Sequence, residues 1–522
     1  MNIGKCLAGV LLAWSFAALP PAAAEVKLPA ILSDNMVLQQ GARAPVWGTA
    51  DPGEEVTVTI AGQRWQATAD PAGRWSLKLD PMKAGGPLEM VVAGRNTIRV
   101  QNVMVGEVWL CSGQSNMQFT MGNAQNPQQE AAQATYPEIR TFNVELAIST
   151  EPKSDCQGSW IVCSPQVVRR EFSAVAYYFG RELHRTLGAP IGLINSSWGG
   201  TAIQLWMDRR TLESDPELRP IVARADKSLT DFAGEFLARN AGPIREWAMT
   251  AEKAKAEGKP VPLPPVLPLD PRILTWDGGP SLATSIYNAM VAPLTPYAIE
   301  GVIWYQGEAN AWEAYRYRKL LPMMIQGWRR AWGQRDLPFL FVQLANFTPS
   351  LPDPRESNWA ELREAQLMTL SLPRTGMAVT IDIGEADDIH PRNKQEVGRR
   401  LGLAAEAIAY GRDLVYSGPI YQSMAIEGDK IRLRFTQTGG GLITAGRGAP
   451  EGFAIAGDDR RFVWAYAEIA GDTVLVSSPK VPKPVAVRYA WADNPVCNLY
   501  NREGLPASPF RTDSWPGITE GR

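Results

Sequence analysis

Cys111-Ser-Gly-Gln-Ser-Asn-Met117, which follows the apolar run of residues 105–110, is the stretch of sequence that decides the fold. An apolar run followed by a glycine-containing turn predicts a buried strand whose end presents Ser115. A serine becomes a nucleophile only when a base can accept its proton. The chain contains two histidines, His184 and His390, so few bases are available.

The two histidines stand in different sequence contexts. His184 belongs to residues 172–187, whose apolar residues recur at helical spacing before a glycine and a proline, so we expect it in the last turn of a helix. A histidine there faces the negative end of the helix dipole and needs no catalytic explanation. His390 follows the apolar run 377–383 in a predicted loop, where catalytic residues of open α/β sheets collect. His390 is therefore the predicted base.

Two further segments have the same pattern of an apolar run followed by a glycine-containing turn. They are Asn195-Ser-Ser-Trp-Gly-Gly-Thr201 and Trp304-Tyr-Gln-Gly-Glu-Ala-Asn310. Acyl transfer needs donors for the developing oxyanion, and a glycine N–H together with a side-chain amide supplies them. Each motif alone has a plainer interpretation: the serine as a helix N-cap, the glycines as a turn, and Gln306 with Glu308 as a buried hydrogen-bonded pair. Their combination favours a hydrolase.

Five ordered blocks of the chain resemble the sialate O-acetylesterase family. The blocks are residues 106–117, 172–177, 198–201, 303–308 and 388–394. The resemblance covers essentially the whole chain after its first 24 residues. It implies an α/β fold with a flavodoxin-like SGNH hydrolase domain. The pattern of strands and helices predicts three layers for this domain and flanking β-sandwich domains.

The resemblance also implies roles for individual residues. Ser115 would be the nucleophile and His390 the general base. Gly200 and Gln306 would be oxyanion donors beside the Ser115 N–H, with Gly199 as the alternative to Gly200. The serine would attack an acetyl carbonyl, the histidine would protonate the departing sugar hydroxyl, and water would hydrolyse the acetyl-enzyme.

The resemblance identifies the acid that orients the histidine less precisely than it identifies the serine and the histidine. Asp387 has the Asp-x-x-His spacing that lets a carboxylate reach the imidazole Nδ1, and we expect it to be the third catalytic residue. Asp388 and Asp382 are the alternatives. A dyad whose histidine is oriented by a backbone carbonyl is a further alternative, because only the orientation of the imidazole is required.

The length and patterning of the chain predict several domains, because 522 residues exceed what one hydrophobic core usually serves. The divisions that we expect are a signal peptide at 1–24, a β-sandwich domain at 25–104, the hydrolase domain at 105–412 with an insertion at 208–275, and a β-rich domain at 413–522.

Composition limits the ligands and partners. A net charge of −2 gives no basic stripe for nucleic acid and no patch for a membrane surface. With two histidines and no Cys-x-x-Cys pair, we expect no metal and no other cofactor. Sugar faces stack on indole rings, so Trp198 and Trp304, which flank the motifs, are candidate substrate-binding residues. Arg392 is the candidate cation for the carboxylate of a sialic acid. The oligomeric state stays open.

The first residues have the pattern of an export signal. Lys5 is followed by an apolar stretch at 7–19 and by Ala22-Ala-Ala24, which predicts cleavage before Glu25 and a periplasmic or secreted protein. In an oxidising compartment, Cys156 and Cys163 are the plausible disulfide.

The sequence therefore predicts an exported carbohydrate O-acetylesterase of the sialate O-acetylesterase type, a serine carboxylic-ester hydrolase whose partner is an acetylated sugar or polysaccharide. An esterase for an acetylated plant polysaccharide, such as xylan or xyloglucan, is the alternative substrate class. A non-catalytic carbohydrate-binding protein on a hydrolase scaffold is the alternative of another class, and the presence of both Ser115 and His390 argues against it.

Overall fold

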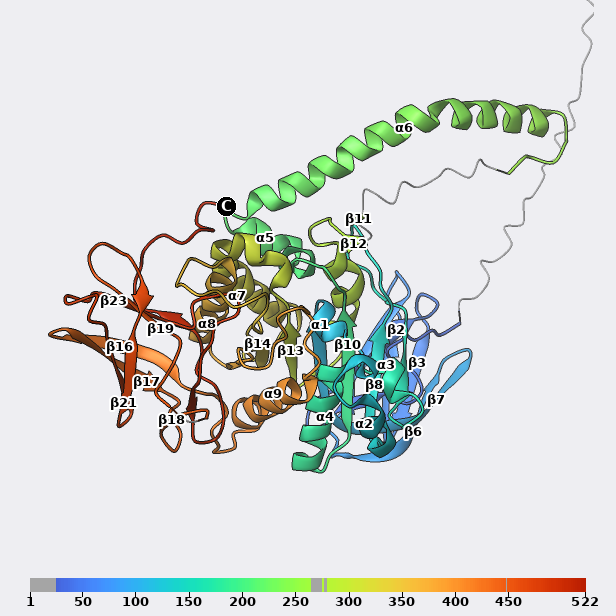
Figure 1. Ribbon diagram of the computed structural model, residues 1–522. Helices are drawn as coiled ribbons and strands as arrows, with labels where there is room; N and C mark the ends of the chain where they lie inside the picture. Colours follow the sequence, from blue (N-terminus) through green and yellow to red (C-terminus); the bar gives the residue numbers. More distant parts are fainter. Residues whose placement is uncertain (1–24, 264–274, 277–278, 447) are drawn as a thin grey trace, which may run out of the picture.

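The computed structural model describes residues 25–263, 275–276, 279–446 and 448–522. The predicted signal peptide and most of the proline-rich end of the predicted insertion lie outside these residues. The chain forms a mixed α/β body, with N-terminal strands on one side, a C-terminal group of small sheets on the other and one long helix that projects from the body (Figure 1).

A core of five parallel strands has the order β10-β7-β13-β14-β15, with β15 at one edge of the main sheet. Its strands are β7 (Thr97–Gly113), β10 (Ile191–Ser197), β13 (Gly301–Tyr305), β14 (Phe339–Val342) and β15 (Thr375–Ala378). Nearly every residue in the last four strands, and in the second half of β7, is buried. Burial on both faces of a parallel sheet explains why the sequence shows continuous apolar runs rather than alternation.

Two strands extend this core beyond β10. β8 (Ile139–Val144) pairs with β10 in parallel, and β9 (Gly158–Val162) pairs with β8 antiparallel, so the whole sheet is mixed. β9 also corrects the predicted disulfide. Cys156 and Cys163 are free thiols at opposite ends of this strand. Five extended residues span more than about 13 Å, far beyond the Cα separation of about 7 Å that a disulfide can bridge.

The N-terminal strands are continuous with the central sheet. The 17-residue β7 passes through the position of the expected division between residues 104 and 105. Its first half pairs antiparallel with β6 (Gly85–Ala93), and β1 (Val37–Gln39) pairs with its middle in parallel. The other N-terminal strands are β3 (Glu55–Ile60) and β4 (Gln63–Thr68) in the same sheet, and β2 (Pro45–Thr49) and β5 (Arg74–Lys78) in a separate pair. One hydrophobic core runs from these strands into the α/β region.

Two pairs of helices accompany the sheet. α4 (Ala174–Leu187) packs along α9 (Lys394–Ile408). The two helices are so close at Gly398 that a Cβ added there would lie 2.5 Å from the Tyr178 Cβ. α7 (Ala314–Ala331) packs against α8 (Asn358–Met368). His184 lies in the last turn of α4, as predicted, and its Nδ1 is 2.9 Å from the carbonyl oxygen of Ala189. It therefore has a structural partner away from the Ser115 turn.

The described part of the predicted insertion contains two helices. α5 (Arg209–Ser214) is joined by the Arg209–Asp226 ion pair to α6 (Arg219–Ala256), the long helix that projects from the body in Figure 1. Within the described residues, none of the helices combines the length and the apolarity that a membrane span requires.

The C-terminal residues form small antiparallel sheets around a second hydrophobic core. One sheet contains β16 (Ile420–Glu427), β17 (Lys430–Thr436), β22 (Thr473–Ser477) and β21 (Tyr466–Ala470), and another contains β20 (Val463–Trp464), β19 (Phe453–Ala456), β23 (Ala486–Tyr489) and β25 (Phe510–Arg511). The buried Arg363 of α8 donates to the carbonyl oxygens of Ala492 and Asp493, so polar contacts attach this region to the α/β body.

Candidate active site

Three parallel strands end at one level beside the predicted nucleophile. Gly113, the last residue of β7, is in register with Ser197 at the end of β10 and with Tyr305 at the end of β13. The Gln114 N–H then donates to the Tyr305 carbonyl oxygen at 3.0 Å. Gly113 has a φ of +140°, and a Cβ there would lie 2.1 Å from that oxygen, so the turn requires glycine. Ser115 thus begins α1 (Ser115–Gln118) at the carboxyl ends of the strands.

Ser115 and His390 meet at this edge of the sheet. The Ser115 Oγ lies 2.8 Å from the His390 Nε2 across a separation of 275 residues. His390 comes from the segment between β15 and α9, and its ring lies 6.3 Å from the Phe119 ring at an interplanar angle of 19°. A hydroxyl within hydrogen-bond reach of an imidazole is the arrangement in which a serine can be activated by a general base.

The carboxylate beside the imidazole is Asp388 rather than the expected Asp387. The Asp388 Oδ1 lies 3.4 Å from the His390 Nδ1, which is longer than an ordinary hydrogen bond. Asp387 is exposed and makes no ion pair or hydrogen bond with another described residue. The cause is local: the Asp388 Oδ1 accepts the His390 backbone N–H at 2.8 Å, an Asx turn that holds the carboxylate near the ring.

Asp382, the other alternative, is engaged elsewhere. Its two carboxylate oxygens accept from Arg400 of α9 at 2.7 and 2.8 Å, and Oδ2 also accepts the Tyr500 hydroxyl at 3.1 Å. This carboxylate holds α9 and the C-terminal region together, so its contacts give it a structural role.

The two candidate glycines differ in their surroundings. The Gly199 N–H donates to the Gln118 Oε1 at 2.9 Å, and a Cβ at this position would lie 3.2 Å from the Ser115 Cβ. Gly199 is therefore close to the nucleophile, but its donor is occupied. Gly200 has a φ of +72° and open space around it, and its N–H has no hydrogen-bond acceptor among the described residues. Gly200 thus stays the predicted oxyanion donor.

The Gln306 amide is hydrogen-bonded to residues other than the serine, which argues against its predicted role as an oxyanion donor. Its Nε2 donates to the Thr201 carbonyl at 3.2 Å and to the Asn310 Oδ1 at 2.7 Å, and its Oε1 accepts the Tyr317 hydroxyl at 2.9 Å. The residue is fully buried. Because both amide hydrogens have partners, the side chain holds the turn after β13 to neighbouring segments.

The two predicted sugar-binding tryptophans also differ. Trp304 is fully buried between Trp206 and Trp328, with ring centroids 5.9 and 5.7 Å away, so its faces are closed to a sugar. It points inward because it belongs to a strand that is buried on both faces. Trp198 follows β10 and is only partly buried, so it stays a candidate.

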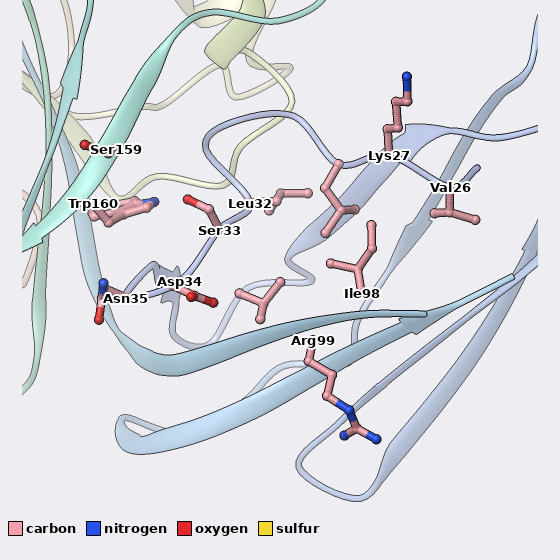
Figure 2. A pocket seen from close by; sticks show the side chains of 12 residues that line it. Val26, Lys27, Leu32, Ser33, Asp34, Asn35, Ile98, Arg99, Ser159 and Trp160 are labelled. Atoms are coloured by element: carbon pink, nitrogen blue, oxygen red, sulfur yellow. The ribbon is translucent and has the colours of Figure 1, made fainter. Parts of the chain in front are cut away.

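A polar cleft of about 970 Å³ adjoins the site. Phe119, Asp388 and Arg392 line it together with the amide side chains of Asn123 and Gln125. The positive charge of Arg392, the predicted cation, is partly compensated by Glu385. The Arg392 Nε lies 3.6 Å from the Glu385 Oε1, which also accepts the Arg392 backbone N–H at 2.8 Å. A second cavity, of about 630 Å³, lies among the N-terminal strands and β9, and none of the predicted site residues lines it (Figure 2).

A buried polar cluster beside Ser115 was not predicted from the sequence. Asn116, next to the nucleophile, bonds to Glu308, to the Ile389 carbonyl oxygen and to the Lys394 Nζ. All these residues stand in the blocks that carry the family resemblance. Up to 278 residues separate them, however, and nothing in the sequence shows that the lysine is buried. Among the described residues, no group of three or more histidine, cysteine, aspartate or glutamate side chains is placed to hold a metal ion.

Comparisons with known proteins identify the family of this chain. The family model for carbohydrate esterases of the sialic acid-specific acetylesterase type matches residues 105–238 and 237–408. The sialate O-acetylesterase of Mus musculus is 32% identical over 530 residues, covering 92% of this chain and 93% of the relative. That of Homo sapiens is 32% identical over 540 residues, covering 93% of each chain.

A solved structure is similar over almost the whole fold. The crystal structure of a carbohydrate acetylesterase from Xanthomonas citri matches with a TM-score of 0.79 and 40% identity, covering 94% of this chain and 100% of that one. These similarities favour an enzyme over a carbohydrate-binding protein on an inactive scaffold. The chain therefore belongs to the carbohydrate esterase family of sialic acid-specific acetylesterases, and it is a carboxylic-ester hydrolase.

Proposed function

We propose that this esterase hydrolyses acetyl esters of sugar hydroxyl groups through an acetyl-enzyme on Ser115, with His390 as the base and Asp388 as the carboxylate that orients it. The observation that carries the proposal is the 2.8 Å contact between the Ser115 Oγ and the His390 Nε2. With the Nδ1 proton directed toward Asp388, Nε2 is the nitrogen with a free lone pair, so it can accept the serine proton.

The reaction proceeds in two halves. The Ser115 oxygen attacks the acetyl carbonyl as His390 takes its proton, and the oxyanion accepts hydrogen bonds from the Ser115 and Gly200 N–H groups. Collapse of this intermediate breaks the bond to the sugar oxygen, which receives the proton from His390. Water then attacks the acetyl-enzyme with His390 again as the base, which releases acetate and restores the serine.

The test uses turnover of p-nitrophenyl acetate by single and double variants. We expect Ser115→Ala and His390→Ala each to lose nearly all activity while keeping the fold, and the double variant to be little worse, because members of one catalytic unit are not additive. His184→Ala, which removes the other histidine, is the matched control and should retain activity. Independent, multiplying losses would contradict the shared mechanism.

Two substrate classes are open to this site. Relatives named as sialate O-acetylesterases support a sialic acid, whose carboxylate needs a cation such as Arg392. The compensation of Arg392 by Glu385 and the amide-lined cleft favour a neutral polysaccharide such as acetylated xylan or xyloglucan. Acetate release from acetylated sialic acid, xylan and xyloglucan separates the two. Arg392→Gln should lower activity on the sialic acid alone if the first class is correct.

We further propose export and a flavodoxin-like layering of the hydrolase region. The charge, apolar run and alanines of residues 1–24 support export, and the mature protein should then begin at Glu25 by mass spectrometry. Numbered among themselves, the five core strands β10-β7-β13-β14-β15 have the order 2-1-3-4-5, which is the flavodoxin order, and the parallel strand β8 is added beyond β10. A crystal structure with both helix pairs on the same face of this sheet would contradict the layering.

A further inference from the structure

The side chain next to the nucleophile is an amide that joins three separate segments. Asn116 is 1% exposed, and its Nδ2 donates to the Glu308 Oε1 at 2.6 Å and to the Ile389 carbonyl oxygen at 3.0 Å. Its Oδ1 accepts from the Lys394 Nζ. With both of its hydrogens and its oxygen engaged, the amide has one favourable orientation.

The positions of these partners link the two halves of the catalytic pair. Asn116 directly follows Ser115, and Ile389 directly precedes His390. The Asn116–Ile389 hydrogen bond therefore runs beside the 2.8 Å contact between the serine and the histidine. A rotation of the Asn116 amide would release the histidine segment from the serine turn.

Lys394 is in an unusual environment. It is fully buried at the first position of α9, where the positive end of the helix dipole disfavours a cation. Its Nζ lies 4.8 Å from the ring centroid of Phe119 and 5.4 Å from that of Tyr305. Burial lowers the pKa of this ammonium group to about 7, although Glu308, Asp388 and Glu385 oppose the shift. Such a placement costs stability, which indicates a purpose beyond packing.

The burial of the Glu308 side chain also costs stability. Its Oε2 is buried without a hydrogen-bond partner among the described residues, while its Oε1 accepts from Asn116. Burial raises the pKa of this carboxyl group. A buried amine and a buried carboxyl group thus contact opposite ends of one amide: the Lys394 Nζ donates to its oxygen, and the Glu308 Oε1 accepts from its nitrogen. Lys394 requires the oxygen, and Glu308 requires a hydrogen.

We infer that Lys394, Asn116 and Glu308 form a positioning network that fixes the distance between the Ser115 oxygen and the His390 imidazole. None of the three takes part in bond making. Lys394 and Glu308 set the orientation of the Asn116 amide, and Asn116 in turn holds the carbonyl that precedes His390. The inference rests on the proposed roles of Ser115 and His390, and it assigns a function to the Glu308 and Lys394 side chains, which the mechanism itself does not use.

The inference is tested with a cycle of Asn116→Asp, Glu308→Gln and the double variant. Asn116→Asp replaces the amide hydrogens with an oxygen, which loses the bonds to Glu308 and Ile389 and places two carboxylates together. A small misplacement of reacting groups costs roughly 10²-fold, so we expect kcat on p-nitrophenyl acetate to fall by about that factor. KM should change less than about twofold, because none of these contacts involves the substrate.

The double variant supplies the readout that a merely structural role would not give. The introduced amide at 308 can donate to the introduced carboxylate at 116, which restores one hydrogen bond in the reverse direction and removes the repulsion. We expect kcat to recover roughly tenfold relative to Asn116→Asp, but not fully, since the bond to the Ile389 carbonyl stays lost. Glu308→Gln alone keeps an acceptor for Asn116 and should lose less than about tenfold.

Lys394→Met tests the other end of the network, because methionine keeps much of the length and removes the ammonium group. We expect kcat to fall at least tenfold. Lys319→Met, at a partly exposed lysine paired with Glu217, is the matched control and should leave kcat unchanged. Thermal unfolding confirms that each variant is folded, and the cycle at 116 and 308 decides the question if Lys394→Met does not fold.

The outcomes separate this inference from the proposed mechanism. If Ser115→Ala is inactive but the folded Asn116→Asp variant keeps kcat within about threefold of wild type, or the double variant shows no recovery, the positioning network is refuted and the mechanism stands. If Ser115→Ala retains activity, the mechanism itself fails.

Discussion

Replacing Asp388 by asparagine separates the charge of this side chain from its shape. The Asx turn survives in Asp388→Asn, because an amide oxygen can still accept the His390 N–H that Asp388 now accepts at 2.8 Å. What is lost is the negative charge 3.4 Å from the His390 Nδ1. The variant therefore measures how much that charge contributes to stabilising the imidazolium during catalysis.

The magnitude follows from the distance and the exposure. Two unit charges at 3.4 Å attract by about 1 kcal/mol in water and by about 5 kcal/mol at an effective dielectric constant of 20. The Asp388 side chain is 48% exposed and that of His390 is 35% exposed, so solvent screening places the effect in the lower half of this range. We expect roughly 1–3 kcal/mol, a fall in kcat of about 5-fold to 150-fold. The loss of about 10⁴-fold known for buried triad carboxylates should not be reached.

The assay is kcat for p-nitrophenyl acetate at saturating substrate, with Asp387→Asn as the matched control. That variant makes the same change of charge one residue away, at an exposed side chain with no contact to the imidazole, and should change kcat less than about twofold. A larger loss in Asp387→Asn than in Asp388→Asn would refute the assignment of the acid. Small losses in both would leave a Ser-His dyad.

Three further predictions follow from particular contacts. Gln306→Ala should lower the free energy of unfolding by about 1–3 kcal/mol, because it removes the hydrogen-bond partners of buried polar groups. It should reduce kcat less than tenfold. A fall of about 10²-fold in a stably folded variant would support the oxyanion role instead. Gly113→Ala should abolish soluble, active protein, because its Cβ would lie 2.1 Å from the Tyr305 oxygen, and expression at wild-type yield and activity would contradict this geometry. Lys394 has a pKa lowered to about 7 when folded, so the unfolded chain binds more protons above that pH and stability rises with pH. Between pH 7.5 and 8.5, denaturant unfolding should show wild type gaining up to about 1.4 kcal/mol relative to Lys394→Met. Equal slopes would show that the pKa of Lys394 is not lowered in the folded protein.

The sequence predicts the contact between Ser115 and His390 better than it predicts the residues around them. Ser115 and His390 were predictable because a chain with two histidines offers few bases, and His184 has the pattern of a helix end. The parallel core was predictable because strands buried on both faces appear as continuous apolar runs. Both kinds of signal are local in the sequence, so they can be recognised without knowledge of tertiary contacts.

The remaining residues depend on contacts that no local pattern encodes. Asp388 rather than Asp387 faces the imidazole because one side chain captures a backbone N–H two residues on. Trp304 is closed to sugars because two other tryptophans, 98 residues before and 24 residues after it in the chain, pack on it. A lysine next to a motif is normally expected at the surface, and only the fold shows that Lys394 is buried against Asn116.

Trapping of the covalent intermediate tests the central claim most directly. The protein is mixed with p-nitrophenyl acetate, quenched in acid during turnover, digested and analysed by mass spectrometry, with Ser115→Ala treated in parallel. We predict one added acetyl group on the peptide that contains Ser115 and none in the variant. An acetyl group on another residue, or full turnover by folded Ser115→Ala, would contradict it.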